Sequence, residues 1–261
     1  MIRKMLRDTF KPGRRNFIKI ASVGTLAVVG IPQIVSAALA TEKSSSKLKF
    51  NNGDIILFQG DSITQWGRDL NITEPNTTKA LGSGYTLITA SKLLLDHPEK
   101  DLKIYNKGIS GNKVYQLAER WDADCLGLKP NILSIHVGVN DFWHTLTNSY
   151  TGTIDTYIAD YKKLLDRTKQ ALPDVKLVIC EPFASKGVRA VDDKWYPTFD
   201  LFRKAAHDLA TEYEAIFVPY QTAFDKAIQS TPAAYWSMDG VHPSVAGEAL
   251  MAQTWLKAVV G

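Results

Sequence analysis

Residues 54–64 read Asp-Ile-Ile-Leu-Phe-Gln-Gly-Asp-Ser-Ile-Thr, an apolar run that stops abruptly at Gly60-Asp61-Ser62. A short apolar run of this kind indicates a buried strand. In open α/β folds, ligands bind at the sheet edge where the parallel strands end. This strand would therefore deliver the Ser62 hydroxyl to such an edge. A serine becomes a nucleophile only when a base takes its proton and donors receive the oxyanion, so Ser62 needs partners elsewhere in the chain.

Three later segments offer those partners. They are Asn106-Lys107-Gly108-Ile109-Ser110-Gly111-Asn112, Gly138-Val139-Asn140-Asp141 and Asp239-Gly240-Val241-His242. Of the five histidines, only His242 has both a carboxylate three residues before it and a proline directly after it. That spacing lets Asp239 accept a hydrogen bond from Nδ1 of His242 while Nε2 faces Ser62. Asp239 could also serve the start of the helix expected after Pro243, and the two roles are compatible.

In this order, the four segments resemble the motifs of the SGNH (GDSL) hydrolase family, and the resemblance extends from Asp54 to about the C-terminus. It implies a catalytic set of Ser62, Asp239 and His242. It also implies an oxyanion hole made by the backbone N–H groups of Ser62 and Gly111 and the side-chain amide of Asn140. Gly108 and Gly111 both have a plain turn interpretation, and the family spacing favours Gly111 as the donor.

Apolar strands and amphipathic helices alternate after residue 50. Strands are expected over 54–60, 102–107, 132–138, 176–182 and 215–219, and helices over 84–96, 114–128, 153–171, 199–213 and 244–259. The pattern predicts a three-layer α/β/α sandwich with a central parallel sheet. A flavodoxin-like strand order would put the first and third strands at the centre, so that Ser62 and Asn140 face one crevice. The Gly-x-Ser-x-Gly elbow of α/β-hydrolases is absent from the sequence.

The first 40 residues have the composition of an export signal. Arg14-Arg15 precede an uncharged stretch from Ile20 to Ala40, which ends in Ala38-Leu39-Ala40. We interpret 1–40 as a twin-arginine signal peptide, 41–50 as a linker and 51–261 as one hydrolase domain. The alternative is an uncut membrane anchor, which the weak apolarity of the stretch disfavours. The processed protein would be periplasmic or extracellular, with no stable membrane insertion.

Charge and cysteine usage limit the partners. Residues 41–261 hold 24 basic and 26 acidic side chains, so nothing suggests binding to nucleic acid. The chain has no Cys/His cluster, His-Glu-x-x-His motif or Walker-type phosphate loop, and we expect neither a metal nor a cofactor. Cys125 and Cys180 could pair in an exported protein, but two separate buried thiols fit their apolar surroundings better. His136, inside an expected strand, is interpreted as a packed core residue.

Aromatic residues near the motif segments bear on the substrate. Trp66 follows Ser62, Trp143 and His144 follow Asn140, and Trp195 and Trp236 lie in later loops. Rings of this kind stack on sugars or line an acyl pocket, so Trp66, Trp143 and His144 are candidate substrate-binding residues. Nearby basic residues such as Arg68 are interpreted as solvated surface charge. Gly138 is expected to let the backbone pass close to the Ser62 turn.

The resulting hypothesis is an exported serine esterase that removes short acyl groups, acetyl above all, from carbohydrate esters through an acyl-enzyme intermediate. Its substrate would be a small-molecule or oligosaccharide ester. A lysophospholipase or thioesterase acting on longer acyl chains is the alternative if a long apolar groove exists. A non-catalytic carbohydrate-binding domain that has kept the fold is a third possibility.

Overall fold

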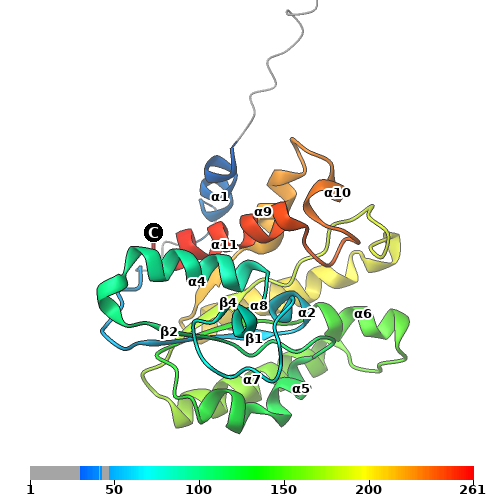
Figure 1. The fold of residues 1–261 in the computed structure, drawn as a ribbon. Coiled ribbons are helices and arrows are strands. Elements are labelled where there is room, and N and C mark those ends of the chain that lie inside the picture. The colour runs from blue at the N-terminus through cyan, green and yellow to red at the C-terminus, as the bar shows by residue number, and fades with distance from the viewer. Residues whose placement is uncertain (1–29, 41, 43–46) are drawn as a thin grey trace, which may run out of the picture.

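A five-stranded parallel sheet lies at the centre of the protein (Figure 1), in a computed structural model that describes residues 30–40, 42 and 47–261. The strand order is β2-β1-β3-β4-β5. The strands are β1 (Ile55–Gly60), β2 (Lys103–Asn106), β3 (Ile132–His136), β4 (Lys176–Cys180) and β5 (Ile216–Val218). This order confirms the predicted flavodoxin-like topology with the first and third strands adjacent.

The strands are buried because helices cover both faces of the sheet. Helices α4 (Tyr85–Asp96), α9 (Tyr220–Ala227) and α11 (Val245–Val259) lie on one side, and α5 (Val114–Glu119), α7 (Ile154–Ala171) and α8 (Thr198–Glu212) lie on the other (Figure 1). The predicted three-layer α/β/α sandwich is therefore confirmed. The register pairs Gly60 with His136, so the carboxyl ends of β1 and β3 meet at one edge of the sheet.

Shorter elements follow the strand ends or lie on the surface. They are α1 (Ile31–Leu39), α2 (Ser62–Gln65), α3 (Thr78–Leu81), α6 (Val139–Thr147) and α10 (Ala233–Trp236). The helix expected over 114–128 is wrong as one element, because it breaks after Glu119 and resumes as a π-helix over Asp122–Leu126. Trp121, at the break, is fully buried, and its Nε1–H donates to Thr168 on α7 at 2.9 Å. This packing stabilises the break.

The core contains both cysteines as separate thiols, since Cys125 and Cys180 are each free and buried. His136 is 1% exposed and stacks on Phe183 with ring centroids 6.0 Å apart, which confirms it as a core residue. Burial lowers its pKa to about 3, so it stays neutral. Residues 1–29, which hold most of the expected signal peptide, lie outside the described residues. Among the described helices, none has the length and apolarity needed to cross a membrane.

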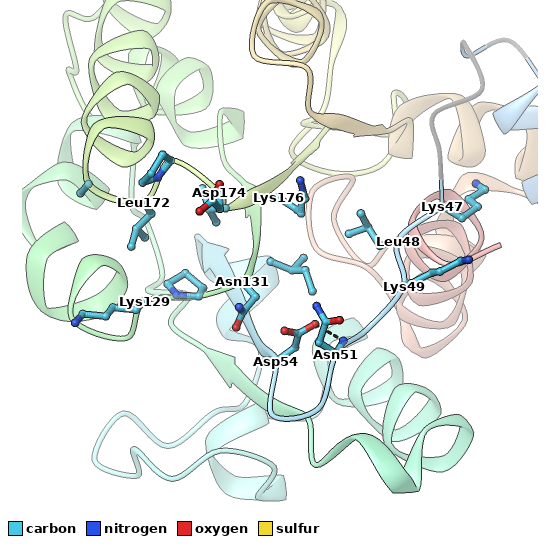
Figure 2. A pocket seen from close by; sticks show the side chains of 15 residues that line it. Lys47, Leu48, Lys49, Asn51, Asp54, Lys129, Asn131, Leu172, Asp174 and Lys176 are labelled. Carbon is cyan, nitrogen blue, oxygen red and sulfur yellow. Dashed lines mark hydrogen bonds between the residues drawn. The ribbon is translucent and has the colours of Figure 1, made fainter.

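A cavity of about 640 Å³ lies at the edge of the sheet away from Ser62 (Figure 2). It is lined by residues at the amino ends of β3 and β4, among them Ile132 and Lys176, and by Lys47, Leu48 and Asp54. Catalytic groups of parallel α/β folds lie at the opposite, carboxyl ends of the strands. This cavity is therefore separate from the site that contains Ser62.

Candidate active site

Ser62, His242 and Asp239 form a continuous chain of hydrogen bonds. Ser62 Oγ lies 2.9 Å from His242 Nε2, and His242 Nδ1 lies 2.8 Å from Asp239 Oδ2. The other oxygen of Asp239 accepts the backbone N–H groups of His242 at 2.7 Å and Val241 at 2.9 Å. The second oxygen thus fixes the loop that holds the imidazole. A serine, an imidazole and a carboxylate in this geometry can transfer the serine proton to the ring.

The carboxylate of Asp239 and the imidazole of His242 stabilise each other's charged form. Partial burial opposes ionisation of Asp239, but the hydrogen bonds from His242 and Val241 lower its pKa to about 2. For His242, burial alone would lower the pKa, but the hydrogen bond and charge of Asp239, with the charge of Asp61, raise it above 6.5. Asp239 is therefore ionised at neutral pH, where it orients the ring and stabilises its protonated form.

The turn that carries Ser62 is capped by its neighbour. Asp61 Oδ1 accepts the backbone N–H of Ile63 at 3.0 Å, so Asp61 is the N-cap of α2. Asp61 is fully buried, and burial raises its pKa to about 7. Ser62 occupies the first helical turn, where backbone N–H groups have no partner within the helix. Asp61 therefore braces the turn that carries Ser62 and is not placed as a base.

The glycine loop after β2 packs directly on this turn. The backbone N–H of Ile109 donates to Gly60 O at 3.0 Å, and that of Ser110 donates to Gln65 Oε1 at 2.5 Å. A Cβ atom on Gly108 would lie 2.5 Å from the backbone nitrogen of Gln65, so no side chain fits there. Gly111 has φ +77°, a left-handed conformation that favours glycine. Gly108 is therefore required because there is no room for a side chain, and Gly111 because of its backbone conformation.

The loop after β3 is tied to the same glycine loop. Asn140 lies in the first turn of α6 and is 3% exposed, and its Nδ2 donates to Asn112 O at 3.4 Å. Asp141 Oδ1 accepts the backbone N–H of Val114 at 3.1 Å, and burial raises the pKa of Asp141 to about 7. Through the bond from Val114, Asp141 joins the start of α6 to the start of α5. The structure thus brings together the loops of Ser62, Gly111 and Asn140.

Two candidate substrate-binding rings flank His242. The ring centroid of Trp66 lies 5.7 Å from that of His242, and that of Trp143 lies 6.3 Å from it. The third candidate, His144, lies beside the glycine loop, because its Cε1 would be 3.7 Å from a Cβ on Gly111. Burial and the charge of Lys113 lower the pKa of His144. Trp66 and Trp143 therefore lie beside the imidazole of His242, and His144 lies beside the glycine loop.

Three sequence expectations are wrong. Trp195 and Trp236 are 1% and 5% exposed and belong to the core rather than to the rim. Arg68 is 8% exposed and donates from Nε to Gly108 O at 2.8 Å, so it braces the glycine loop and is no solvated charge. The constraint on Gly138 is also different, because a Cβ there would lie 2.9 Å from the hydroxyl of Tyr157.

Sequence reasoning missed the support for Asp239. Two backbone N–H groups of the loop after β4 donate to the segment that carries Asp239, Ala190 to Asp239 O at 2.9 Å and Ser185 to Gly240 O at 2.7 Å. Backbone donors carry no signature in the sequence, so these two bonds could not be predicted from it. Within the described residues, no three His, Cys, Asp or Glu side chains gather in a way that could hold a metal ion.

The comparisons with known proteins agree with this geometry. Residues 58–250 match the GDSL-like lipase/acylhydrolase family. An acetylxylan esterase from Geobacillus stearothermophilus is 33% identical over 214 residues, which cover 81% of this chain and 96% of the relative. The crystal structure of a GDSL-like lipase from Parabacteroides merdae is 53% identical, with a TM-score of 0.81, and covers 82% of this chain and 98% of that one.

The solved structure of the Geobacillus acetylxylan esterase has a TM-score of 0.73 at 32% identity and covers 81% of this chain and 96% of its own. In three further structures of that esterase, a serine, an aspartate or a histidine is replaced by alanine. Each of these variants is a catalytic mutant. The aspartate and histidine are three positions apart there, as Asp239 and His242 are here.

The parallel sheet, the motif loops and these matches define a carboxylic ester hydrolase of the SGNH type. The chain belongs to the GDSL-like lipase/acylhydrolase family.

Proposed function

We propose that this chain is an exported serine esterase that removes short acyl groups, acetyl above all, from carbohydrate esters through an acyl-enzyme intermediate. The observation that carries the proposal is the hydrogen-bond chain from Ser62 Oγ to His242 Nε2 and from Nδ1 to Asp239. The catalytic residues are Ser62 as nucleophile, His242 as base and Asp239 as its charged partner.

In the first half-reaction, Ser62 Oγ attacks the ester carbonyl carbon while His242 Nε2 takes the hydroxyl proton. The carbonyl oxygen becomes an oxyanion, which accepts hydrogen bonds from the backbone N–H groups of Ser62 and Gly111 and from Asn140 Nδ2. One such donor is worth about 2.7–4 kcal/mol in the transition state. The carbon–oxygen bond to the sugar then breaks, and His242 gives its proton to the leaving sugar oxygen, which departs as a hydroxyl.

The second half-reaction repeats these steps with water. His242 Nε2 takes a proton from a water molecule, which attacks the acyl carbon bound to Ser62. The same three donors stabilise the second oxyanion. Its collapse releases the carboxylic acid and returns the proton from His242 to Ser62 Oγ. Asp239 stays ionised throughout, because its hydrogen bonds with His242 hold its pKa at about 2.

The proposed substrate rests on the surroundings of Ser62. Trp66 and Trp143 flank His242, and His144 lies beside Gly111. Flat aromatic rings stack on sugar faces. A relative that is 33% identical is an acetylxylan esterase, which supports an acetylated carbohydrate as the substrate of this chain too.

A chain-length series of p-nitrophenyl esters from acetate to palmitate, with acetate release from acetylated xylan and pectin, tests the substrate. The specificity constant should be highest for acetate and fall as the acyl chain lengthens. A maximum at eight carbons or more, with no acetate released from any glycan, would favour the lysophospholipase or thioesterase alternative. Ser62→Ala should abolish hydrolysis with unchanged melting, whereas Ser91→Ala, at an exposed position of α4, should keep full activity.

If instead wild-type protein bound acetylated glycans without hydrolysing any ester, the chain would be a carbohydrate-binding domain. Labelling with a fluorophosphonate distinguishes this outcome directly, because it modifies only an activated serine. A labelled Ser62 supports the esterase. No label on any serine, in protein shown by circular dichroism to be folded, would contradict it.

The export proposal rests on Arg14-Arg15 ahead of the uncharged stretch that ends at Ala40. A twin-arginine signal would carry an already folded domain across the bacterial inner membrane and leave a product that starts near Thr41. Replacing Arg14 and Arg15 by lysine should leave the protein in the cytoplasm. If the processed enzyme still reached the periplasm, the general secretory route would replace this one.

A further inference from the structure

Helix α1 (Ile31–Leu39) packs on the folded domain although it lies within the stretch interpreted as the end of the leader. Ile34, Val35 and Ala38 are 3%, 1% and 0% exposed, so they form a buried stripe along one face. Gln33 and Ala37 are exposed on the helix surface. A helix of nine residues is not stable alone in water, so the packing of this stripe holds α1 in place.

The surface that receives α1 is formed by α9 and α11, and Figure 1 shows α1 on their outer side. Helix α11 forms much of this surface. Only Val245, Gln253 and Lys257 of its 15 residues are exposed, although the sheet and α4 pack against only part of it. A helix that is apolar nearly all round is built to be buried on every side. The outer apolar face of α9 and α11 therefore fits the short apolar helix that lies on it.

The chain beyond α1 is also tied to the domain. Glu42 Oε2 lies 3.3 Å from Nε2 of His207 on α8. Lys47 Nζ donates to the last carbonyls of α11, to Lys257 O at 2.6 Å and Ala258 O at 2.8 Å. Figure 2 shows Lys47 and Leu48 beside α11. These contacts hold Glu42 and Lys47 against the folded domain close to the end of α1.

We propose that residues 31–39 dock as a helix on the α9/α11 face of the folded full-length chain, and that this docking protects the Ala38-Leu39-Ala40 processing sequence. Ala38 is fully buried, and Leu39 ends the helix, whereas a protease takes its substrate as an extended segment. Cleavage after Ala40 then requires α1 to leave the surface first, so the rate of leader removal follows the fraction of molecules with α1 undocked. The docking is independent of the proposed esterase activity, and only its effect on processing rests on the proposed leader.

Hydrogen exchange on the full-length chain tests the docking. The matched variants are Val35→Asp, at a buried position, and Ala37→Asp, at an exposed position of the same helix. In the wild type the amides of residues 34–40 should be protected. Val35→Asp should speed their exchange by about tenfold or more, and Ala37→Asp by less than about twofold. Val35→Ala, a milder change, should give an intermediate rate. Circular dichroism confirms that the domain is folded in each variant.

Cleavage by bacterial signal peptidase tests the consequence. Each rate is divided by the rate on a synthetic peptide of residues 29–45 with the same substitution, which removes the preference of the peptidase for the sequence itself. The normalised rate should be low for the wild type and Ala37→Asp and at least about tenfold higher for Val35→Asp. Equal exchange in both aspartate variants, or unprotected amides in the wild type, would overturn the docking. Protected amides with equal normalised cleavage rates would overturn the control of processing alone.

Discussion

Glu248 Oε2, on α11, accepts the backbone N–H of Tyr85 at 2.6 Å, so the last helix of the chain caps the start of α4. The residue before α4, Gly84, has no side chain that could make this bond. Orphan N–H groups at a helix start need such an acceptor. A Cβ on Gly84 would lie 3.0 Å from Cβ of Trp66 and 3.1 Å from Glu248 Oε2, so this cap also supports one wall of the candidate site.

This cap should make stability depend on pH. Burial raises the pKa of Glu248 to about 8, and its Oε1 has no partner among the described residues. The unfolded chain releases this proton near its ordinary pKa of about 4.3, whereas the folded chain keeps it, so the free energy of unfolding falls as pH rises from about 4.3 to 8. Glu248→Gln keeps an oxygen for Tyr85 and removes the charge. This substitution should raise the free energy of unfolding by about 1–3 kcal/mol at pH 8.5 and change it little at pH 4.5.

Urea unfolding at several pH values measures this effect. Glu119→Gln, which removes an exposed carboxylate on α5, is the control and should leave the pH dependence as in the wild type. If Glu248→Gln lost stability at pH 8.5, the ionised carboxylate would be stabilising, and the inferred burial cost would be wrong.

The second prediction concerns the base. His242 must be neutral to take a proton, and Asp239 raises its pKa against the effect of burial. Activity of the wild type should therefore rise with pH through a midpoint above 6.5. In Asp239→Asn the raising charge is lost and burial remains, so the midpoint should move to lower pH while the plateau of kcat falls by orders of magnitude, about 10⁴ in the best-studied triad.

Profiles of kcat and of kcat/KM from pH 4.5 to 9 give the plateau and the midpoint. His97→Gln, at the end of α4, should leave the midpoint unchanged. An unmoved midpoint in Asp239→Asn would mean that some other group sets the pH dependence, and Asp239 would lose its proposed role.

The third prediction concerns the oxyanion hole. Asn140 is 3% exposed and lies in the first turn of α6, where its Nδ2 donates to Asn112 O in the glycine segment. Asn140→Ala and Asn140→Asp both remove the amide donor, and each should lower kcat by about 10²–10³ with little change in KM. Asn148→Ala, at the exposed C-terminal end of the same helix, should keep normal kinetics. Full activity in Asn140→Ala would exclude this amide from the hole.

Much of this arrangement follows from local sequence pattern. The apolar runs of β1 and β3 predict strands, and parallel pairing then brings Gly60 beside His136, so Ser62 and Asn140 must leave the same sheet edge. Because Asp239 and His242 are three residues apart, one carboxylate oxygen of Asp239 can bond to Nδ1 of His242. The other oxygen can then accept the backbone N–H of His242. Both predictions need only short-range geometry and the strand order.

Features set by packing between distant segments could not be read in this way. Arg68 looks like a surface charge, yet its nearest acceptor, Gly108 O, lies 40 residues away in the chain. Trp195 ends a single 3₁₀ turn (Asp193–Trp195) after β4, but it packs against Phe142 and Trp143 of α6. The π-helix over Asp122–Leu126 likewise depends on Trp121 meeting Thr168 of α7. In each case the partner is chosen by tertiary structure.

The fourth prediction separates a ring on the site from one in the core. Trp143 is half-buried beside His242, whereas Trp195 is 1% exposed and donates from Nε1 to Ala190 O at 2.8 Å. Trp143→Ala should raise KM for acetylated xylooligosaccharides by about two- to tenfold, the equivalent of 0.5–1.5 kcal/mol, with a smaller effect on p-nitrophenyl acetate. Trp195→Phe should instead lower the free energy of unfolding by about 1–3 kcal/mol.

Steady-state kinetics on the two substrates and urea unfolding of both variants check this contrast. If Trp143→Ala changed KM equally for the glycan and the p-nitrophenyl ester, the ring would belong to the acyl pocket rather than to a sugar subsite.

The last prediction concerns Gly108, whose identity is set by space. A Cβ there would lie 2.5 Å from the nitrogen of Gln65 and 2.8 Å from the carbonyl carbon of Thr64, both in the backbone of the helix that Ser62 begins. Gly108→Ala must therefore push that helix and the glycine loop apart. Because misplacement by about 1 Å can cost 10²-fold in rate, kcat should fall by about that factor or more.

Gly53→Ala is the matched control, since Gly53 has φ +77° but a Cβ there would have no atom within 4 Å. It should cost about 1 kcal/mol of stability through backbone strain and leave kcat unchanged. Equal kinetics in the two variants would show that close contact between the glycine loop and α2 is not what positions Ser62.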